Sequence, residues 1–373
     1  MQRPLFRLGH AIAITASLSL TLPSLSFATP SDTPVTPPAG ALPSTVKQHA
    51  LAKGLYQLEY SPHHHRLYAA VAGDRTDPND HGALLAIDPD TLQITARYPT
   101  QARPFGLALD DNAGRLYTSD TLEGSISLFD LNHDGHLIKS VRLAEKAPGE
   151  EKYPFRPREI RLDIAHHRLY VSALAEQGRI YVLDSRTLDT VSIFNNVGKK
   201  PTGLAIDSKG QRLFLSNGDG EIQILSAQDG QLLGREKVGI LPLNLLYDEA
   251  SQRLYATDYK AHHLTIIDVK DSVRPQVIQQ IPTGQGPVSL LALSDHQTLA
   301  VTEHDAGSIG IFDLRTGQRQ GEIPLGYQPN SLAIVPGHQT LFVSVKQPRN
   351  KDLSTEGLDS IARIDLSRGN LSK

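Results

Sequence analysis

Residues 157–187 read PREIRLDIAHHRLYVSALAEQGRIYVLDSRT, and this pattern decides the fold because it returns along the chain. Residues 159–164, 168–174 and 179–184 alternate apolar and polar side chains or are rich in β-branched and aromatic residues, as strands are. The turns between them hold Gly, Asp and Ser, which supply positive φ or bond their own backbone. Residues 189–195 add a fourth such segment. The stretch therefore predicts a unit of four short strands.

The Arg-Leu-Tyr motif of this unit returns as Arg-Leu-Tyr or Arg-Leu-Phe in five copies, and weaker copies at residues 298–300 (TLA) and 340–342 (TLF) bring the number to seven. The central leucines are Leu67, Leu116, Leu169, Leu213, Leu254, Leu299 and Leu341. Twelve residues earlier stands a proline in copies two to seven, at Pro104, Pro157, Pro201, Pro242, Pro287 and Pro329. A period of about 40–50 residues with four strands is typical of a propeller blade. The sequence therefore predicts an all-β, seven-bladed β-propeller with four-stranded blades.

The two ends of the repeat array indicate how the ring closes. Copy seven ends shortly after Asp365 and leaves no good outer strand, whereas residues 45–51 precede copy one without a blade of their own. We expect this N-terminal segment to form the outermost strand of the last blade. Residues 44–373 are then one propeller, with blades starting near residues 54, 104, 157, 201, 242, 287 and 329.

The N-terminus has the pattern of an export signal. Residues 1–28 begin with Arg3 and Arg7, continue with an apolar run and end on Ser26-Phe27-Ala28, as cleavable signal peptides do. Residues 29–43 are rich in proline and small residues, which predicts a flexible leader. We expect a periplasmic location if the source is Gram-negative, no membrane insertion, and a monomer.

Composition excludes several kinds of chemistry. The chain has no cysteine, which excludes disulfides, thiol catalysis, thiolate metal sites and covalent c-type haem. Its net charge is −3, and without the two arginines of residues 1–28 it is −5, which argues against general coating of polyanions. No phosphate-cradling glycine loop, Gly-x-Ser-x-Gly elbow or His-Glu-x-x-His motif occurs. We expect no metal and no cofactor.

The repeat resembles a known family. Residues 201–207 (PTGLAID) and 168–187 match the pattern of the YVTN-repeat propellers, and residues 54–366 as a whole resemble the YncE-like exported proteins. The resemblance implies a periplasmic seven-bladed propeller of mostly unassigned function. It also implies single-stranded DNA as a partner of some relatives, although no motif in this chain specifies nucleic acid.

Insertions are expected on one face of the propeller, which we call the insertion face. It carries the loop that leads into each innermost strand and the loop between the second and third strands. The segments 73–82 and 346–357 lengthen blades one and seven, and residues 145–156 precede blade three. Blades one and seven are neighbours in a closed ring, so we expect their long loops to lie side by side. Long loops on a rigid scaffold are common binding sites, although tolerated insertions without a role are the alternative.

Basic residues are predicted to gather at the channel mouth on the insertion face. The residue before each blade's proline should lie at the rim, and three blades place a cation there. The candidate ligand-binding residues are Arg103, Arg156 and Lys200 at the rim, Arg158 and Lys199 beside them, and Arg75, Lys346 and Arg349 in the long loops. This arc predicts an anionic ligand or polymer, or an envelope protein. The alternative is that these residues pair with acids such as Glu123 or Glu145, or stay solvated.

A hydrolase is the second functional hypothesis. Asp258, Glu303 and His304 end the second strands of blades five and six, where an acid–base or metal site of the lactonase type is conceivable by fold analogy. The Asp at the end of most third strands, as at Asp184 and Asp313, is interpreted as a turn-forming residue, because a catalytic group would not repeat in six blades.

Overall fold

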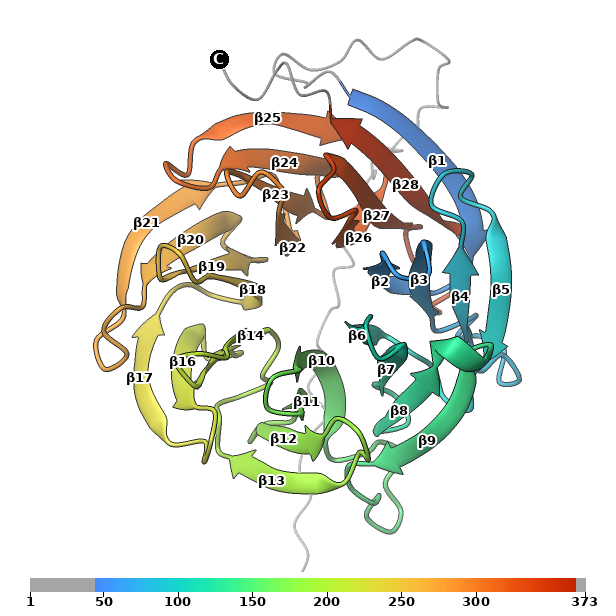
Figure 1. Ribbon diagram of the computed structural model, residues 1–373, viewed down its shortest axis with the longest axis horizontal. Coiled ribbons are helices and arrows are strands. Elements are labelled where there is room, and N and C mark those ends of the chain that lie inside the picture. Colours follow the sequence, from blue (N-terminus) through green and yellow to red (C-terminus); the bar gives the residue numbers. More distant parts are fainter. Residues whose placement is uncertain (1–43, 367–373) are drawn as a thin grey trace, which may run out of the picture. The chain divides into compact units, whose positions relative to one another are not determined.

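A computed structural model of the protein describes residues 44–366, which lie within one compact unit. The expected signal peptide (residues 1–28), the leader (29–43) and the tail after residue 366 fall outside the described residues. Seven four-stranded antiparallel sheets surround a common axis, each with its first strand innermost (Figure 1). The predicted seven-bladed β-propeller is confirmed. No helix among residues 44–366 is both long enough and apolar enough to cross a lipid bilayer.

Blades 1 to 4 follow the chain in order. Blade 1 holds β2 (Leu55–Ser61), β3 (Arg66–Val71), β4 (Ala83–Ile87) and β5 (Ile94–Pro99). Blade 2 holds β6 (Gly106–Asp110), β7 (Arg115–Asp120), β8 (Ser125–Asp130), the short 3-10 helix η1 (Leu131–His133) and β9 (His136–Arg142). Blade 3 holds β10 (Arg156–Asp163), β11 (Arg168–Leu174), β12 (Arg179–Asp184) and β13 (Thr190–Asn195). Blade 4 holds β14 (Leu204–Asp207), β15 (Arg212–Ser216), β16 (Glu221–Ser226) and β17 (Leu232–Lys237).

Blades 5 to 7 complete the ring. Blade 5 holds β18 (Pro242–Asp248), β19 (Arg253–Asp258), β20 (His263–Asp268) and β21 (Gln276–Pro282). Blade 6 holds β22 (Pro287–Ala292), β23 (Thr298–Glu303), β24 (Ser308–Asp313) and β25 (Arg319–Pro324). Blade 7 holds β26 (Gln328–Ile334), β27 (Thr340–Lys346), β28 (Asp359–Leu366) and, as its outermost strand, β1 (Ser44–Ala52).

The ring closes as the sequence predicts. Strand β1 pairs antiparallel with β28, from Ser44 opposite Leu366 to Ala52 opposite Asp359. Figure 1 shows the N-terminal strand lying along the outer side of the last blade. The two ends of the repeat array are thus joined by backbone hydrogen bonds, which ties blade 7 to blade 1.

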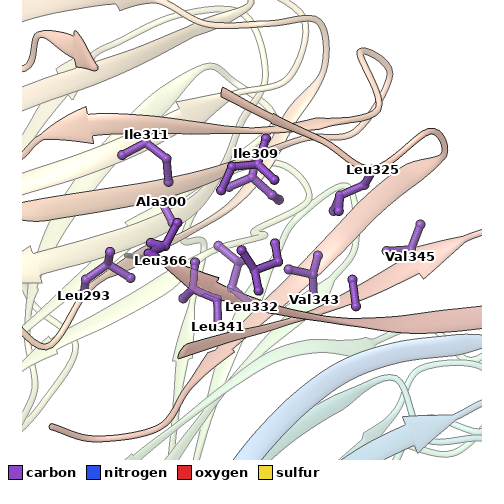
Figure 2. Packing of buried hydrophobic residues seen from close by; sticks show 13 residues of the cluster. Leu293, Ala300, Ile309, Ile311, Leu325, Leu332, Leu341, Val343, Val345 and Leu366 are labelled. Atoms are coloured by element: carbon purple, nitrogen blue, oxygen red, sulfur yellow. The ribbon is translucent and has the colours of Figure 1, made fainter. Parts of the chain in front are cut away.

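Apolar side chains bury the faces where neighbouring blades meet. Because side chains alternate along a strand, each blade has two faces, and both must be covered by its neighbours. The cluster in Figure 2 joins blade 6 to blade 7: Ile309 and Ile311 of β24 pack with Leu341 and Val343 of β27. The RLY leucines are all at most 1% exposed, so the motif that marks the repeat is a core motif.

Hydroxyl groups on the second strands also join the blades. Ser119 accepts the N–H of Gly106 in its own blade at 3.0 Å and donates to the carbonyl of Arg158 in the next blade at 2.8 Å. The equivalent residues Ser172, Ser216 and Thr257 make the same two kinds of bond. Blade 1 has Ala70 at this position, and the amide of Gln57 replaces the hydroxyl by donating to a carbonyl of β6 at 2.8 Å. These bonds fix the first strands that line the channel.

Candidate functional site

A cavity of about 510 Å³ occupies the centre of the ring. It is lined by residues of β2, β10, β14, β18, β22 and β26, together with Phe105 just before β6. The pairing register shifts near the start of the first strand in five blades, for example between Leu55 and Leu58 and between Pro157 and Ile160. Such a bulge turns consecutive residues toward the same side. Adjacent pairs such as Tyr56-Gln57 and Arg158-Glu159 therefore both reach the cavity.

The two sides of this cavity differ in chemistry. Blades 1 and 3 contribute its charged side chains, and blades 4 to 7 contribute mainly apolar and amide groups. The charged side is formed by Glu59, Arg158, Glu159 and Arg161, and the facing side includes Ala205, Asn244, Leu246, Val288, Leu291, Asn330 and Ala333. A ligand in this cavity would meet charges on one side and a mixture of apolar and amide groups on the other.

Arg161 is fully engaged by its surroundings. Its guanidinium lies 2.5 Å from the carboxylate of Glu159 and donates to the carbonyls of Leu204 and Ile160 at 3.1 and 3.3 Å. Glu159 is 7% exposed, whereas the Arg161 side chain is 34% exposed and faces the cavity. We infer that the pair shapes the wall of the cavity and leaves its charge balanced.

Glu59 has no such partner. Within residues 44–366 its carboxylate makes no ion pair, and its one side-chain bond is from the amide of Gln57 at 3.4 Å. Burial raises the pKa of Glu59 to about 7, Arg161 and Gln57 lower it, and Glu159 adds to the rise. Glu59 is partly buried, and a carboxylate that is removed from water without a partner is costly unless it is protonated. The pocket therefore holds a carboxyl group poised to change its charge near neutral pH.

Arg158 is the corresponding cation. It lies at the insertion-face end of the cavity, directly after the proline that starts blade 3. In the part of the chain that the structure describes, its guanidinium has no carboxylate within ion-pair distance. The backbone carbonyl of Arg158 accepts the hydroxyl of Ser119 at 2.8 Å, which holds this residue at the rim.

A second group of cations surrounds Tyr56 at the same mouth. Arg349 donates to its hydroxyl at 2.5 Å, and the ammonium of Lys346 lies 3.9 Å from the ring centroid. Burial by itself raises the pKa of Tyr56, but Lys346, Arg349 and Arg75 together lower it below its usual value. The ring of Phe105 packs against Tyr56 with centroids 4.5 Å apart. The mouth thus combines an aromatic pair with several positive charges.

The two long loops lie side by side, as their places in the repeat predict. A shallow pocket contains Arg75 of the loop in blade 1 and Arg349 of the loop in blade 7. The ion pair of Lys53 with Asp74 at 2.7 Å braces the same region. Residues almost 300 positions apart in the sequence therefore form one edge of the mouth.

The structure places the other predicted ligand-binding residues in different settings. Arg103 donates to the carbonyls of Asp80 and Asp77, both at 3.0 Å, and so holds the long loop of blade 1. Lys346 is largely buried, and its ammonium bonds Asp359 at 2.9 Å and a carbonyl of β2 at 2.7 Å.

The three remaining candidates, like Arg75, Arg103, Lys346 and Arg349, are not among the residues that line the central cavity. Lys199 and Lys200 both pair with Glu176, at 2.9 and 3.1 Å. Arg156 makes no ion pair within residues 44–366. Of the eight predicted residues, Arg158 lines the central cavity, and Arg75 and Arg349 lie together in the shallow pocket, beside Tyr56.

The residues of the hydrolase hypothesis lie in bonded structural positions. The carboxylate of Asp258 accepts backbone N–H groups on both sides of its turn, including that of Ile240 at 2.6 Å. Glu303 is held by Arg319 through both oxygens, and its pKa is lowered by these bonds although burial alone raises it. His304 bonds Asp305 at 2.8 Å. None of the predicted three lines the cavity.

Metal coordination is not offered by the described residues. Among residues 44–366 no group of three or more His, Cys, Asp or Glu side chains is arranged to hold a metal ion.

The repeated Asp at the end of the third strands forms turns, as the sequence predicts. Asp184 accepts the N–H groups of Arg186 and Thr187 at 2.8 and 3.2 Å.

Sequence reasoning missed the charged residues deeper in the channel. Glu59, Glu159 and Arg161 stand two or four residues after the start of their blades, where the other blades carry small, apolar or amide residues. A comparison of equivalent positions in the seven repeats would therefore have identified these three charged residues from the sequence.

Comparison with known proteins supports the family resemblance. The chain is 29% identical over 324 residues to "Uncharacterized protein YncE" of Salmonella typhi and of Salmonella typhimurium, covering 85% of this chain and 90% of each relative. The protein of the same name from Escherichia coli K12 is 29% identical over 227 residues, or 60% of this chain and 64% of that protein. No family model matches the chain.

A solved structure shares the fold. The β-propeller domain of Cps50 (Swd1) from Myceliophteria thermophila superimposes with a TM-score of 0.65 at 12% identity, covering 87% of this chain and all of that domain. At this identity the likeness concerns the fold alone.

Proposed function

Because the chain is a seven-bladed β-propeller with curated homologues named YncE, we propose that it is an exported binding protein that holds an anionic group at the insertion-face mouth of its channel. Arg158 is the principal contact, and Arg75 and Arg349 extend the positive surface along the mouth. The partner is an anionic ligand or polymer, single-stranded DNA among them, or an acidic surface of an envelope protein. Export to the periplasm through residues 1–28 is part of the same proposal.

One observation carries the proposal. Arg158 lines the cavity and lacks a carboxylate partner within the described chain, whereas Arg161 in the same cavity is paired with Glu159. An arginine presents a planar, always charged donor fork that suits carboxylate and phosphate groups. The bond from Ser119 holds the backbone of Arg158 at the rim, and its guanidinium, which has no carboxylate partner within residues 44–366, can bind an anion.

The surroundings of Tyr56 support the same reading. Lys346 and Arg349 of blade 7 lie beside the ring of Tyr56, and Phe105 packs against it, so positive charge and aromatic rings adjoin at the mouth. Anionic polymers with planar groups use both features, since aromatic rings stack while arginines contact the backbone. Lys199 and Lys200 contribute less, because Glu176 already balances them.

The test uses two fluorescein-labelled probes, a 20-residue single strand of oligothymidine and a polyglutamate of the same length. Binding is followed by fluorescence anisotropy with wild type, Arg158→Glu and the triple variant with Glu at Arg75, Arg158 and Arg349. We expect at least a tenfold loss of affinity for Arg158→Glu and a further loss for the triple variant, with binding to wild type weakening steeply as salt rises. The probe that binds more tightly identifies the class of partner.

Lys209→Glu is the matched control. Lys209 lies in the turn between β14 and β15 on the opposite face, and its side chain is 82% exposed. The same change of charge there should leave binding unchanged. If the triple variant, folded by circular dichroism, binds both probes as wild type does, or if neither probe binds wild type, the proposed function is wrong.

A further inference from the structure

We propose that the central cavity takes an extended zwitterion, with the anionic group of the ligand at Arg158 and an ammonium group at Glu59. The contact of Arg158 with the anionic group rests on the proposed function. The contact of Glu59 with the ammonium group is argued independently of it. Short peptides with free termini are the simplest members of this ligand class.

The first argument is the pair of unbalanced charges in one cavity. Glu59 and Arg158 both line it, and within residues 44–366 neither has an ion-pair partner. The other two charged groups of the cavity, Glu159 and Arg161, neutralise each other at 2.5 Å. A ligand that carries one charge of each sign would pair both orphan groups and leave the cavity electrically neutral.

The second argument concerns the cation that suits Glu59. A single carboxylate does not provide the six or more oxygen ligands that calcium takes, and the described residues form no metal-binding group. An ammonium group donates up to three hydrogen bonds, and the two carboxylate oxygens of Glu59 accept only one weak side-chain bond, from the amide of Gln57 at 3.4 Å. Burial raises the pKa of Glu59 to about 7, so a bound ammonium would drive its ionisation.

The third argument is the spacing of the two poles. Arg158 is one residue after the start of its blade at Pro157, and Glu59 is four residues after the equivalent Leu55. Both strands have a bulge here, which sets three of their residues against two of the neighbouring strand. With a rise of about 3.3 Å per strand residue, the two backbone positions therefore differ by roughly 8 Å in depth. A tripeptide spans about the same length between its termini. An α-amino acid, with its two charges on one carbon, is too short.

The remaining walls fit the body of such a ligand. Leu246, Leu291 and Val288 provide an apolar side, and Asn330 provides an amide at the rim. A volume of about 510 Å³ is in the range of small-molecule sites, and the polar groups in the lining suit the peptide units of such a ligand. The cavity is therefore large enough for a tripeptide and too narrow for a folded partner.

The test is calorimetric titration at pH 6.5 with Ala-Leu-Ala, its N-acetyl form and its C-amide form. These probes differ only in which terminal charge is present. We expect the N-acetyl and the C-amide forms each to bind wild type at least tenfold more weakly than Ala-Leu-Ala. In Glu59→Gln the free and N-acetyl peptides should bind alike, and in Arg158→Gln the free and C-amide peptides should bind alike.

A proton readout separates a direct contact from a structural effect. Binding of the ammonium should release a large fraction of a proton from Glu59, so the heat measured for wild type should depend on the ionisation enthalpy of the buffer. Glu59→Gln should lose that dependence, and Lys209→Gln on the opposite face should keep it.

The outcomes distinguish this inference from the proposed function. If N-acetylation and Glu59→Gln have no effect while C-amidation and Arg158→Gln weaken binding, the zwitterion inference fails and the anion site stands. If N-acetylation and Glu59→Gln weaken binding but C-amidation and Arg158→Gln do not, Arg158 does not bind the carboxylate of the peptide, and the zwitterion inference is wrong. If Ala-Leu-Ala does not bind at millimolar concentration, the inference is wrong, whatever the polyanion probes show.

Discussion

At the scale of single residues, the surroundings of an acid decide its charge. The second strands of blades 2 and 6 end on Asp120 and Glu303, both buried. Glu303 meets Arg319, which lowers its pKa against the effect of burial. Asp120 meets only hydroxyl donors, including Ser125 and Ser127 at 3.0 and 2.7 Å, and burial raises its pKa to about 7. Equivalent positions thus hold one ionised and one readily protonated acid.

Replacing Asp120 by Asn should change how stability depends on pH. The pKa of Asp120 is higher in the folded protein than in the unfolded chain, so between about pH 4 and pH 7 the folded state keeps this carboxyl protonated while the unfolded state does not. The free energy of unfolding therefore falls as pH rises from about 4 through about 7. The Asn variant lacks this loss. We expect Asp120→Asn to be more stable than wild type at pH 8, by an amount on the order of 2–4 kcal/mol, with little difference near pH 4.

Urea unfolding at pH 4.5 and pH 8 measures this difference. Asp134→Asn, in an exposed turn with φ of 51° that Asn readily adopts, is the control and should leave the pH dependence unchanged. A variant at Asp120 that loses stability equally at both pH values would show that the carboxylate is ionised and needed.

At the scale of elements, the strands follow from local pattern, whereas their bulges do not. The four strands expected in residues 159–195 agree with β10 to β13 to within a few residues, because alternation and turn residues act over short distances. The register shifts at the start of the first strands depend on pairing with the second strand and on hydroxyls such as Ser172. Those shifts decide which residues reach the channel.

Deleting residues 44–52 should destabilise the whole propeller. Strand β1 is the outermost strand of blade 7, and its loss exposes the edge of β28 and opens the ring. We expect the melting temperature by circular dichroism to fall by several degrees or more. Deleting the nine residues 29–37 is the matched control and should have little effect. An unchanged melting curve after deletion of residues 44–52 would contradict the role of β1 as a clasp.

At the scale of the whole molecule, closure makes distant parts of the sequence neighbours. Blade 7 packs on blade 1, which brings Arg349 to Tyr56 and places Asp359 within 2.9 Å of the N–H of Leu55. Each blade covers the faces of two others, so no blade has an outer cap of its own. Stability and the channel mouth are therefore properties of the ring rather than of any blade.

A core substitution in one blade should weaken the ring as a unit. Phe214 of β15 is fully buried between blades 4 and 5 and packs on Tyr247 with ring centroids 4.9 Å apart. We expect Phe214→Ala to lower the free energy of unfolding by about 3–5 kcal/mol. Hydrogen exchange measured by mass spectrometry should show reduced protection in β3 of blade 1 as well as in β15. Loss confined to blades 4 and 5 would show that the blades unfold separately.

The sequence by itself determined the number of blades, their strands, the closing strand and the face that carries the long loops. These follow from a repeat whose alternation and turn chemistry act over a few residues and whose ends require a partner. Only the tertiary structure decided which charged side chains are paired and which face the channel. Lys200 and Arg158 look alike in sequence, yet one pairs with Glu176 and the other faces the channel. Pairing, burial and the orphan charge of Glu59 arise from convergence of side chains across blades, because electrostatic energy depends on distances that spacing along the chain does not specify.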